Sequence, residues 1–411
     1  MVLGQADLGS HTGDGLTPLS WAAKGGHEAV VKILLERDDV DPNTTDQHGQ
    51  TPLFVAAIRG HEGVVEMLLE RNDVNPNIAD EYGETPLFAA VSGSYEEVVS
   101  ILLERGDVNP NAAENSGKTP LYVAACEGYD GIAKMLLERD DVNPNIADEH
   151  GETPLFIAAR NGWEEVLGML LERNDANPNA ANKYGQMPLC RAAREGYEGV
   201  VEMLLERRDV NPNTADDYGD TPLFAAACEE REGVVKMLLE CNDVNPNTVV
   251  DNGRTPLYIA ACLGCEGVVK ILLEQGEVNP NTANDDGETP LFGAALERHG
   301  GIVEILLARE DVNTNTTNKS GQTPLFAVAC KGYTEIVEML LGRVDVNPNI
   351  ADLAGETAFS QALKRGHHAI VELLSAHRNF IPPLDGDEST ALSSQEPPDP
   401  NRRPSKRIRR L

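Results

Sequence analysis

One pattern of apolar and polar positions recurs along the chain with a period of 34 residues. In the copy at 51–84, small apolar residues recur at helical spacing over 52–59, and larger aliphatic residues do so over 62–71. This spacing predicts two short amphipathic helices, each with an apolar stripe that must be buried. The remaining stretch, 72–84, is rich in Asn, Asp, Pro and Gly, which predicts a long loop.

Local signals support both helices and the loop. Thr51 suits the N-cap of the first helix because its hydroxyl accepts hydrogen bonds from free backbone N–H groups, and Pro52 suits the first helical position. Gly60 adopts left-handed geometry without a steric penalty and predicts the end of that helix. Within the loop, Asp80 and Gly83 predict a tight turn with Asx hydrogen bonding.

The Thr-Pro-Leu that opens this unit occurs eleven times, either identically or as a near copy. The copies begin at residues 17, 51, 85, 119, 153, 187, 221, 255, 289, 323 and 357. A lone unit of this size cannot bury its apolar faces, so neighbouring units must cover one another, which predicts an all-α solenoid. We expect a lead-in at 1–16, an array at 17–378 and a disordered, Pro- and Ser-rich tail at 379–411.

The repeated unit resembles the ankyrin repeat. The matching pieces are TPLF-x-AA at 51–57, GHEGVVEMLLE at 60–70, DVN at 73–75 and D-x-x-G at 80–83. This resemblance implies a stack of about eleven helix-turn-helix units with projecting finger loops. It also implies that the finger tips and first helices form a concave face that binds protein partners.

Three departures from the usual ankyrin pattern affect this expectation. The usual His after Thr-Pro-Leu is Phe or Tyr in most copies, as at Phe54, Tyr122 and Phe156, so apolar packing should replace its hydrogen-bond network. The Gly-Ala that commonly ends the second helix is one residue shorter, and a Pro-Asn after DVN lengthens the finger by two. The resulting 34-residue unit resembles fungal-type ankyrin arrays, which are often attached to other domains.

The charge of the chain restricts the class of partner. The formal net charge is −33, and because the segment from Asn379 onward sums to +1, residues 1–378 carry −34. Such a surface repels nucleic acid and anionic membranes, so we expect neither to bind the array. The charge favours basic protein partners, or serves solubility alone.

Cysteine usage indicates a reducing compartment. The chain has seven cysteines, and its first residues contain no apolar run of signal-peptide length, so we expect a cytoplasmic or nuclear location. Cys262 and Cys265 have the spacing of half a metal or redox motif. However, Cys262 occupies a repeat column that holds small residues, and the adjacent His367 and His368 should face apart on a helix. We expect no metal and no cofactor.

Exceptions to the repeat pattern gather in repeats six and seven. Met187 replaces the capping Thr, at an expected cost of about 1 kcal/mol. Glu230 and Arg231 replace the usual Gly and His or Tyr, and Val250 stands where the turn expects Asp. We expect the array to open or bend between residues 187 and 254, although sequence drift without a role produces the same pattern.

The same region carries an unexpected group of basic and aromatic residues. The ankyrin resemblance places them on the concave face: Arg160, Lys183, Tyr184, Arg191, Arg194 and Tyr218, with Tyr82 at another finger tip. Arg and Tyr dominate binding energy at protein interfaces, and Arg binds carboxylate or phosphate in bidentate fashion. One interpretation is an acidic or phosphorylated partner segment docking at repeats five and six. The alternative is random variation in solvent-facing columns.

The end of the tail is strongly basic. Its cations are Arg402, Arg403, Lys406, Arg407, Arg409 and Arg410. This run matches a basic nuclear-import signal, although short basic runs also occur as solvated tails or weak nucleic-acid contacts.

Motifs that carry catalysis are missing from the sequence. It has no HExxH, no Gly-rich phosphate loop and no Gly-x-Ser-x-Gly, so we expect no enzymatic activity. The first interpretation of function is a monomeric scaffold or adaptor that binds partner proteins. The alternatives are a nuclear regulatory cofactor, and a recognition segment of a larger signalling or sensor protein.

Overall fold

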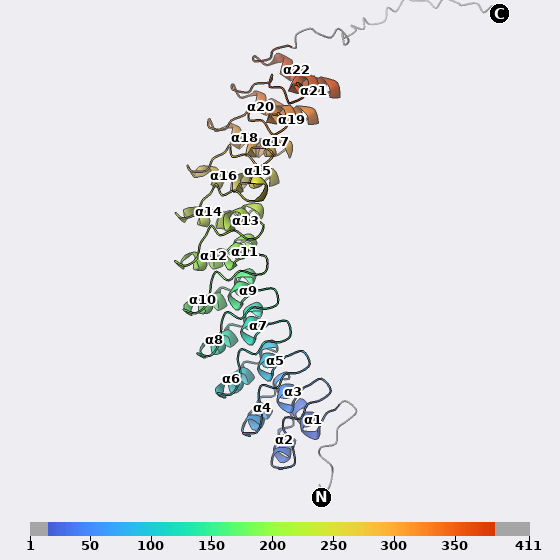
Figure 1. The fold of residues 1–411 in the computed structure, drawn as a ribbon, viewed down its shortest axis with the longest axis vertical. Coiled ribbons are helices and arrows are strands. Elements are labelled where there is room, and N and C mark those ends of the chain that lie inside the picture. Colours follow the sequence, from blue (N-terminus) through green and yellow to red (C-terminus); the bar gives the residue numbers. More distant parts are fainter. Residues whose placement is uncertain (1–14, 383–411) are drawn as a thin grey trace, which may run out of the picture.

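The computed structural model describes residues 15–382, and these residues form a curved stack of helix pairs (Figure 1). They contain 22 α-helices and one short 3₁₀-helix, and no strand occurs among them. Each of the eleven predicted units contributes one helix pair. The all-α solenoid is therefore confirmed over residues 15–382, and the tail from 383 onward lies outside the described residues.

The two helices of each unit form two parallel rows. The first helices are α1 (Pro18–Lys24), α3 (Pro52–Ala57), α5 (Pro86–Ser92), α7 (Pro120–Glu127), α9 (Pro154–Asn161), α11 (Pro188–Glu195), α13 (Pro222–Cys228), α15 (Pro256–Leu263), α17 (Pro290–Leu296), α19 (Pro324–Lys331) and α21 (Ala358–Arg365). The second helices are α2 (Glu28–Leu35), α4 (Glu62–Leu69), α6 (Glu96–Glu104), α8 (Asp130–Leu137), α10 (Glu164–Glu172), α12 (Glu198–Leu205), α14 (Glu232–Glu240), α16 (Glu266–Glu274), α18 (Gly300–Leu307), α20 (Thr334–Leu341) and α22 (His368–Ala376). The 3₁₀-helix η1 (Asp251–Gly253) lies in the finger of repeat seven.

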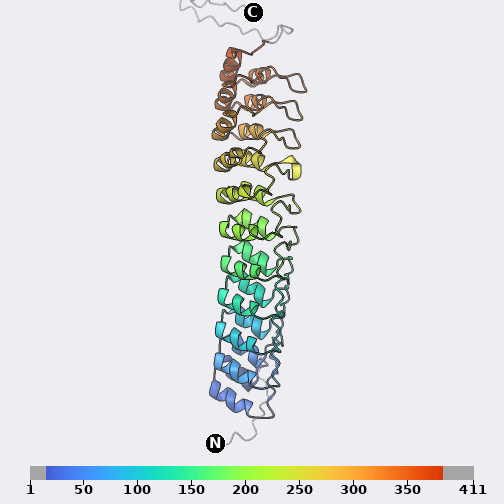
Figure 2. The same ribbon diagram turned by 90° about the vertical axis from the view of Figure 1, so that its left-hand side faces the viewer.

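The stack bows so that the first helices line its concave side and the second helices its convex side (Figure 1). All fingers project to the same side of the stack (Figure 2). Each first helix packs against the second helix of its own repeat and against the first helices of the adjacent repeats. Packing thus joins sequential neighbours, as a solenoid requires.

One hydrophobic core runs along the stack from Leu19 to Leu374. Phe54 and Phe156 are fully buried in it, which confirms that apolar packing replaces the usual His at these positions. Tyrosine behaves differently there: the Tyr122 hydroxyl donates to the Asp148 carboxylate at 3.2 Å. The expectation of purely apolar packing was therefore wrong for this copy, because the phenol reaches the finger turn of its own repeat.

The expected start and stop signals operate, but both helices end about two residues early. The Thr51 hydroxyl accepts from the Phe54 N–H at 3.1 Å, and Gly60 has a φ of 68°. The Arg59 N–H binds the Ala56 carbonyl three residues back, so a tighter turn ends α3 at Ala57. As expected, Met187 forms no side-chain cap on α11.

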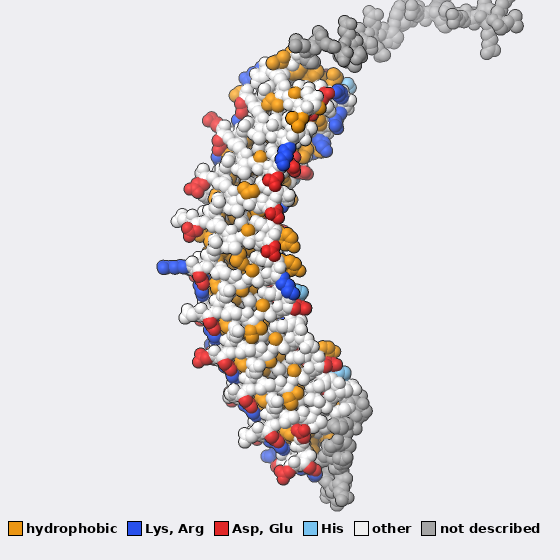
Figure 3. All heavy atoms as spheres, viewed as in Figure 1, with side chains coloured by type: hydrophobic (Ala, Val, Ile, Leu, Met, Phe, Trp, Pro, Cys, Tyr) orange, Lys and Arg blue, Asp and Glu red, His pale blue; other side chains and the backbone are white. Residues whose placement is uncertain are grey.

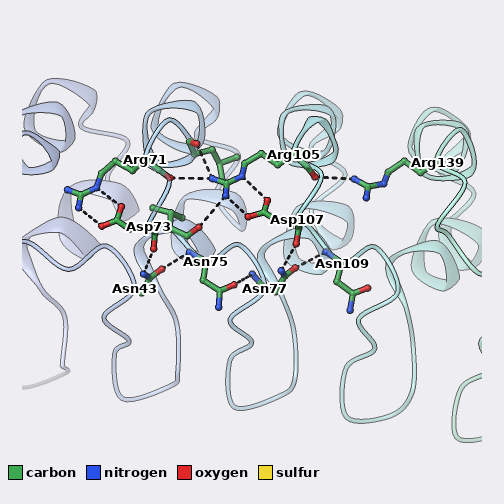
Figure 4. A network of polar contacts seen from close by, with 11 residues as sticks. Asn43, Arg71, Asp73, Asn75, Asn77, Arg105, Asp107, Asn109 and Arg139 are labelled. Carbon is green, nitrogen blue, oxygen red and sulfur yellow. Dashed lines mark hydrogen bonds and ion pairs between the residues drawn. The ribbon is translucent and has the colours of Figure 1, made fainter.

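The fingers are joined by a continuous row of asparagine side chains (Figure 4). The Asn43 amide donates to the Asp73 carbonyl at 2.7 Å and accepts from the Asn75 N–H at 2.8 Å. The donor contact recurs at every junction between repeats, with distances of 2.5–2.8 Å. The donors are Asn43, Asn77, Asn111, Asn145, Asn179, Asn213, Asn247, Asn281, Asn315 and Asn349. We call this row the asparagine ladder.

The last rung of the ladder lies beyond the expected end of the array. Asn349 donates to the Asn379 carbonyl at 2.5 Å and accepts from the Ile381 N–H at 2.8 Å. The Phe380 ring lies 4.9 Å from the Phe359 ring, measured between centroids. The expected boundary at residue 378 therefore moves to 381, because the first tail residues supply the rung that another finger would otherwise supply.

A second row joins the second helices through arginine. Arg105 donates through Nε and Nη2 to both carboxylate oxygens of Asp107, and through Nη1 to the Leu69 carbonyl at 3.0 Å, near the end of the preceding second helix. The guanidinium therefore satisfies a free helix-end carbonyl of the previous repeat. Equivalent contacts to both partners are made by Arg71, Arg139, Arg173, Arg207, Arg309 and Arg343. We call these contacts the arginine clamps.

Repeat seven, at 221–254, has fewer connections to its neighbours than the other internal repeats. Cys241 and Gln275 occupy the clamp position, so the clamp is lost on both sides of this repeat. Val250 cannot accept the two backbone N–H groups that Asp80 accepts in repeat two. Glu230 holds a left-handed φ of 55°, a conformation that a side chain disfavours. These features agree with the predicted weak region, whose opening stays a prediction.

Restoring a clamp should stabilise this region. Cys241→Arg places a guanidinium two residues before Asp243, as in the clamped repeats, and within reach of the preceding helix end. We expect stability to rise by on the order of 1 kcal/mol, measured by urea unfolding. Cys241→Ser is the matched control and should leave stability nearly unchanged. An arginine variant no more stable than the serine variant would contradict the role of the clamp.

Amide hydrogen exchange tests whether repeat seven opens. We expect faster exchange in the helices of residues 221–254 than in the equivalent helices of residues 119–152, because repeat four keeps its clamps. Cys241→Arg should reduce the difference. Equal protection through repeats five to eight would show that the array does not open there.

The clamps should also lose strength in acid. The hydrogen bond from Arg105 holds the pKa of Asp107 below its usual range. A carboxyl whose pKa is lower in the folded chain contributes its stability above the unfolded value of about 3.9, and loses that contribution as pH falls through the folded pKa. We expect Asp107→Asn to destabilise the array at pH 7 and to match the unmodified chain at about pH 2. A constant difference between the two proteins from pH 7 to pH 2 would argue against this pairing.

Candidate functional site

The predicted basic and aromatic residues lie on first helices and finger tips of consecutive repeats. Arg160 is on α9, Arg191 and Arg194 are on α11, and Tyr184 and Tyr218 are at adjacent finger tips. The two tips are joined because the Asp217 N–H donates to the Tyr184 carbonyl at 3.1 Å. The repeat geometry therefore brings the predicted residues of repeats five and six together. Tyr82 lies apart, at the finger tip of repeat two.

The arginines of this group are paired with acids of the chain itself. Arg160 contacts Glu152 at 2.6 Å, and Arg191 contacts Glu195 at 3.0 Å. These ion pairs neutralise the positive charge that we expected to be available to a partner. Direct recognition of an anionic segment by these arginines would require breaking existing ion pairs.

Arg194 is the most enclosed of the three. It contacts the Asp220 carboxylate at 2.7 Å and lies 3.9 Å from a Glu229 oxygen. Burial lowers the pKa of the Arg194 guanidinium, but the hydrogen bond that it donates to Asp220 and the neighbouring charges outweigh burial, so the pKa is raised. The side chain therefore links α11 to the finger of its own repeat, which is a structural role.

Aromatic rings and acids are the groups left exposed here. Tyr184 and Tyr218 are 51% and 58% exposed, which leaves their rings available to a partner. Asp217 and Asp251 at the tips are exposed, and neither forms an ion pair within residues 15–382. Lys183 is an exposed cation at the tip of repeat five, next to Tyr184 in the sequence. The surface formed by Tyr184, Asp217, Tyr218 and Asp251 is named the acidic tip surface.

The cysteine thiols on the first helices are held protonated. Burial raises the pKa of Cys190 and of Cys228 to about 12, and that of Cys262 to about 11. A thiol with such a pKa is a poor nucleophile and a poor metal ligand near neutral pH. Within the described range, no group of three His, Cys, Asp or Glu side chains is arranged to hold a metal ion.

A second group of charged residues, which the sequence reasoning did not single out, lies at the C-terminal end of the concave face. A cleft of about 320 Å³ there is lined by Phe292, Leu296, Cys330, Lys331 and Arg365, with four further residues. Lys331 and Arg365 occupy one repeat column, in which earlier repeats carry Glu195, Glu229 and Glu297. That change of sign along the column is the feature of the sequence that could have indicated this cleft.

The fold and its exposed inner face define an elongated repeat protein whose recognition residues lie along a groove. A family model described as ankyrin repeats (3 copies) matches residues 1–80, 72–148, 141–216, 185–250, 208–282, 233–318 and 276–352. The chain therefore belongs to the ankyrin-repeat family, whose members are generic modules for protein–protein interaction. No curated protein matches the chain. None of the helices in residues 15–382 is long and apolar enough to span a membrane.

Proposed function

We propose that this chain is a monomeric, non-enzymatic scaffold whose acidic tip surface binds a basic segment of a partner protein. The observation that carries the proposal is the pairing of Arg160, Arg191 and Arg194 with acids of the chain, beside acids that remain exposed. A partner therefore meets negative charge and aromatic rings at repeats five to seven. This differs from one interpretation of the sequence, in which an acidic or phosphorylated partner segment docks at this place.

The two tip tyrosines support this choice of partner. Tyrosine supplies a large rigid contact with little loss of conformational entropy on binding. Its ring also attracts a Lys or Arg side chain placed over its face, and nearby carboxylates add to that attraction. Because Tyr184 and Tyr218 stand one repeat apart on linked tips, they suit two cations spaced along an extended segment.

The absence of catalysis is part of the proposal. The exposed acids of the tip surface lie where nothing excludes water, and the buried thiols are held protonated. Neither arrangement provides an activated nucleophile or a tuned acid and base. Binding is the activity that these residues support.

The alternative functions depend on parts of the chain without described structure. Import into the nucleus would use Arg402, Arg403, Lys406, Arg407, Arg409 and Arg410, which lie outside the described residues. A nuclear regulatory cofactor would still bind its partner through the same groove. A cytoplasmic or nuclear location, and a role as the recognition segment of a larger sensor protein, therefore remain compatible with the proposed binding.

Tyrosine variants test the proposed surface. A partner is recovered by affinity capture, and its binding segment is synthesised as a labelled peptide for fluorescence anisotropy. We expect this peptide to be basic, and its affinity for the Tyr184→Ala, Tyr218→Ala double variant to fall by at least about tenfold. Tyr82→Ala, a similarly exposed tip tyrosine in repeat two, is the matched control and should bind normally. An acidic peptide, or equal losses in both variants, would refute the proposal.

A further inference from the structure

The concave face carries an order of charge along its length. At the C-terminal ends of the first helices, Glu229 and Glu297 are exposed in repeats seven and nine, whereas Lys331 and Arg365 are exposed in the same column in repeats ten and eleven. Figure 3 shows Lys and Arg side chains gathered on the concave side at the level of α19 and α21. The face therefore changes from acidic to basic toward repeat eleven.

The finger tips repeat this order. The tips of repeats six to eight carry exposed acids, and the tip of repeat nine carries the exposed cation Lys319. The acids are Asp217, Asp251, Asp285 and Asp286. From repeat six onward, two independent columns thus place cations at the C-terminal end and acids before it, although Arg59 and Lys183 occupy the same columns in earlier repeats.

The cations at this end are available, unlike those of repeats five and six. Lys319, Lys331 and Arg365 form no ion pair with any described residue, although the neighbouring Lys364 is paired with Glu356. One acid, Glu288, lines the same cleft, and it already accepts from the Tyr258 hydroxyl at 3.0 Å and the Asn284 amide at 3.2 Å. The cleft can therefore receive acidic side chains beside an apolar wall.

The sequence after the array has the opposite order of charge. Its acids come first, at Asp385, Asp387, Glu388, Glu396 and Asp399, and the six cations of 402–410 follow. Residues 383–411 lie outside the described residues, so only their sequence bears on this comparison. A segment running back from repeat eleven toward repeat seven would meet cations with its acids, and acids with its cations.

We propose that residues 385–410 bind the concave face of their own chain, running antiparallel to the order of the repeats. The acids of 385–399 lie against Lys319, Lys331 and Arg365, and the basic segment 402–410 lies against Asp285, Asp251 and Asp217. The tail thereby occupies the acidic tip surface. Its role as a competitor of a basic partner rests on the proposed function, whereas its binding to the array does not.

The available length of chain permits this contact. The described part ends at residue 382, and 19 residues lie between it and Arg402. A flexible chain of that length has a root-mean-square span of roughly 25 Å and an extended reach of about 65 Å. Repeats stack about 10 Å apart, so Asp285 in the finger of repeat eight lies roughly 30 Å back from repeat eleven. The basic segment can therefore reach this tip without full extension.

Tethering makes such a contact effective even when each ion pair is weak. A short linker holds the two surfaces at an effective concentration in the millimolar range, so several exposed pairs act together. The contact should weaken with salt, because the Debye length falls to about 3 Å at 1 M ionic strength. A partner with a stronger basic segment would displace the tail and expose residues 402–410.

Zero-length carbodiimide crosslinking of the full chain tests the contact, since this reagent couples a Lys amine to a touching carboxylate. In monomer purified by gel filtration at low salt, we expect Lys331 or Lys319 to be joined to acids of 385–399. We also expect Lys406 to be joined to Asp251, Asp285 or Asp286. Both sets should disappear at 1 M salt. Crosslinks that are missing, or spread evenly along the array, would overturn the proposal.

Charge reversal at matched positions provides the control. Lys331→Glu with Arg365→Glu should abolish the tail crosslinks, whereas Lys24→Glu with Arg59→Glu, at exposed positions near the other end of the array, should leave them intact. Equal effects of the two variants would refute a specific site. Crosslinks between isotopically light and heavy chains, mixed before the reaction, would show that the tail binds the array of a second copy and not that of its own chain.

The outcomes separate this inference from the proposed function. If the tail crosslinks are absent but the basic partner still binds with dependence on Tyr184 and Tyr218, only the tail contact fails. If the crosslinks form but no basic partner binds, the tip surface serves the tail alone and the proposed function fails.

Discussion

Hydrogen bonding between successive repeats is the constraint on which this structure depends. A short helix pair leaves helix-end carbonyls and finger backbone groups without partners, and burying them unpaired would be costly. The Asn43 side chain supplies partners to two backbone groups of the next finger, and Arg105 supplies one to the preceding second helix. Each repeat therefore supplies hydrogen-bond partners to its neighbours. The apolar core is likewise built from contacts between successive repeats.

The asparagine ladder and the arginine clamps differ in how many junctions between repeats they join. The asparagine ladder is present at every junction, whereas the arginine clamp is lost at Cys241 and Gln275. Alignment of the fingers is thus maintained where attachment of the second helices is weaker. The acidic tip surface includes tips on both sides of the junction between repeats six and seven, so its geometry is set by the ladder more than by the clamps.

Features that depend on nearby residues could be predicted from the sequence, whereas contacts that span a repeat could not. The Thr51 cap, the left-handed Gly60 and the Asp80 turn involve contacts within four residues, so the local pattern sufficed. The role of Asn43 was missed because its partners lie 30 and 32 residues away. The pairing of Arg194 is not evident from the sequence because its partner, Asp220, lies in the finger 26 residues later.

The fixed separations in the asparagine ladder also restrict how such a chain can change in length. Inserting or deleting a few residues within a repeat shifts one side of a rung relative to the other, and breaks the alignment of adjoining fingers. Adding or removing a whole 34-residue unit preserves every separation and leaves each new junction with complete rungs. Gene duplication or loss of complete units is therefore the route open to evolution for lengthening or shortening this groove.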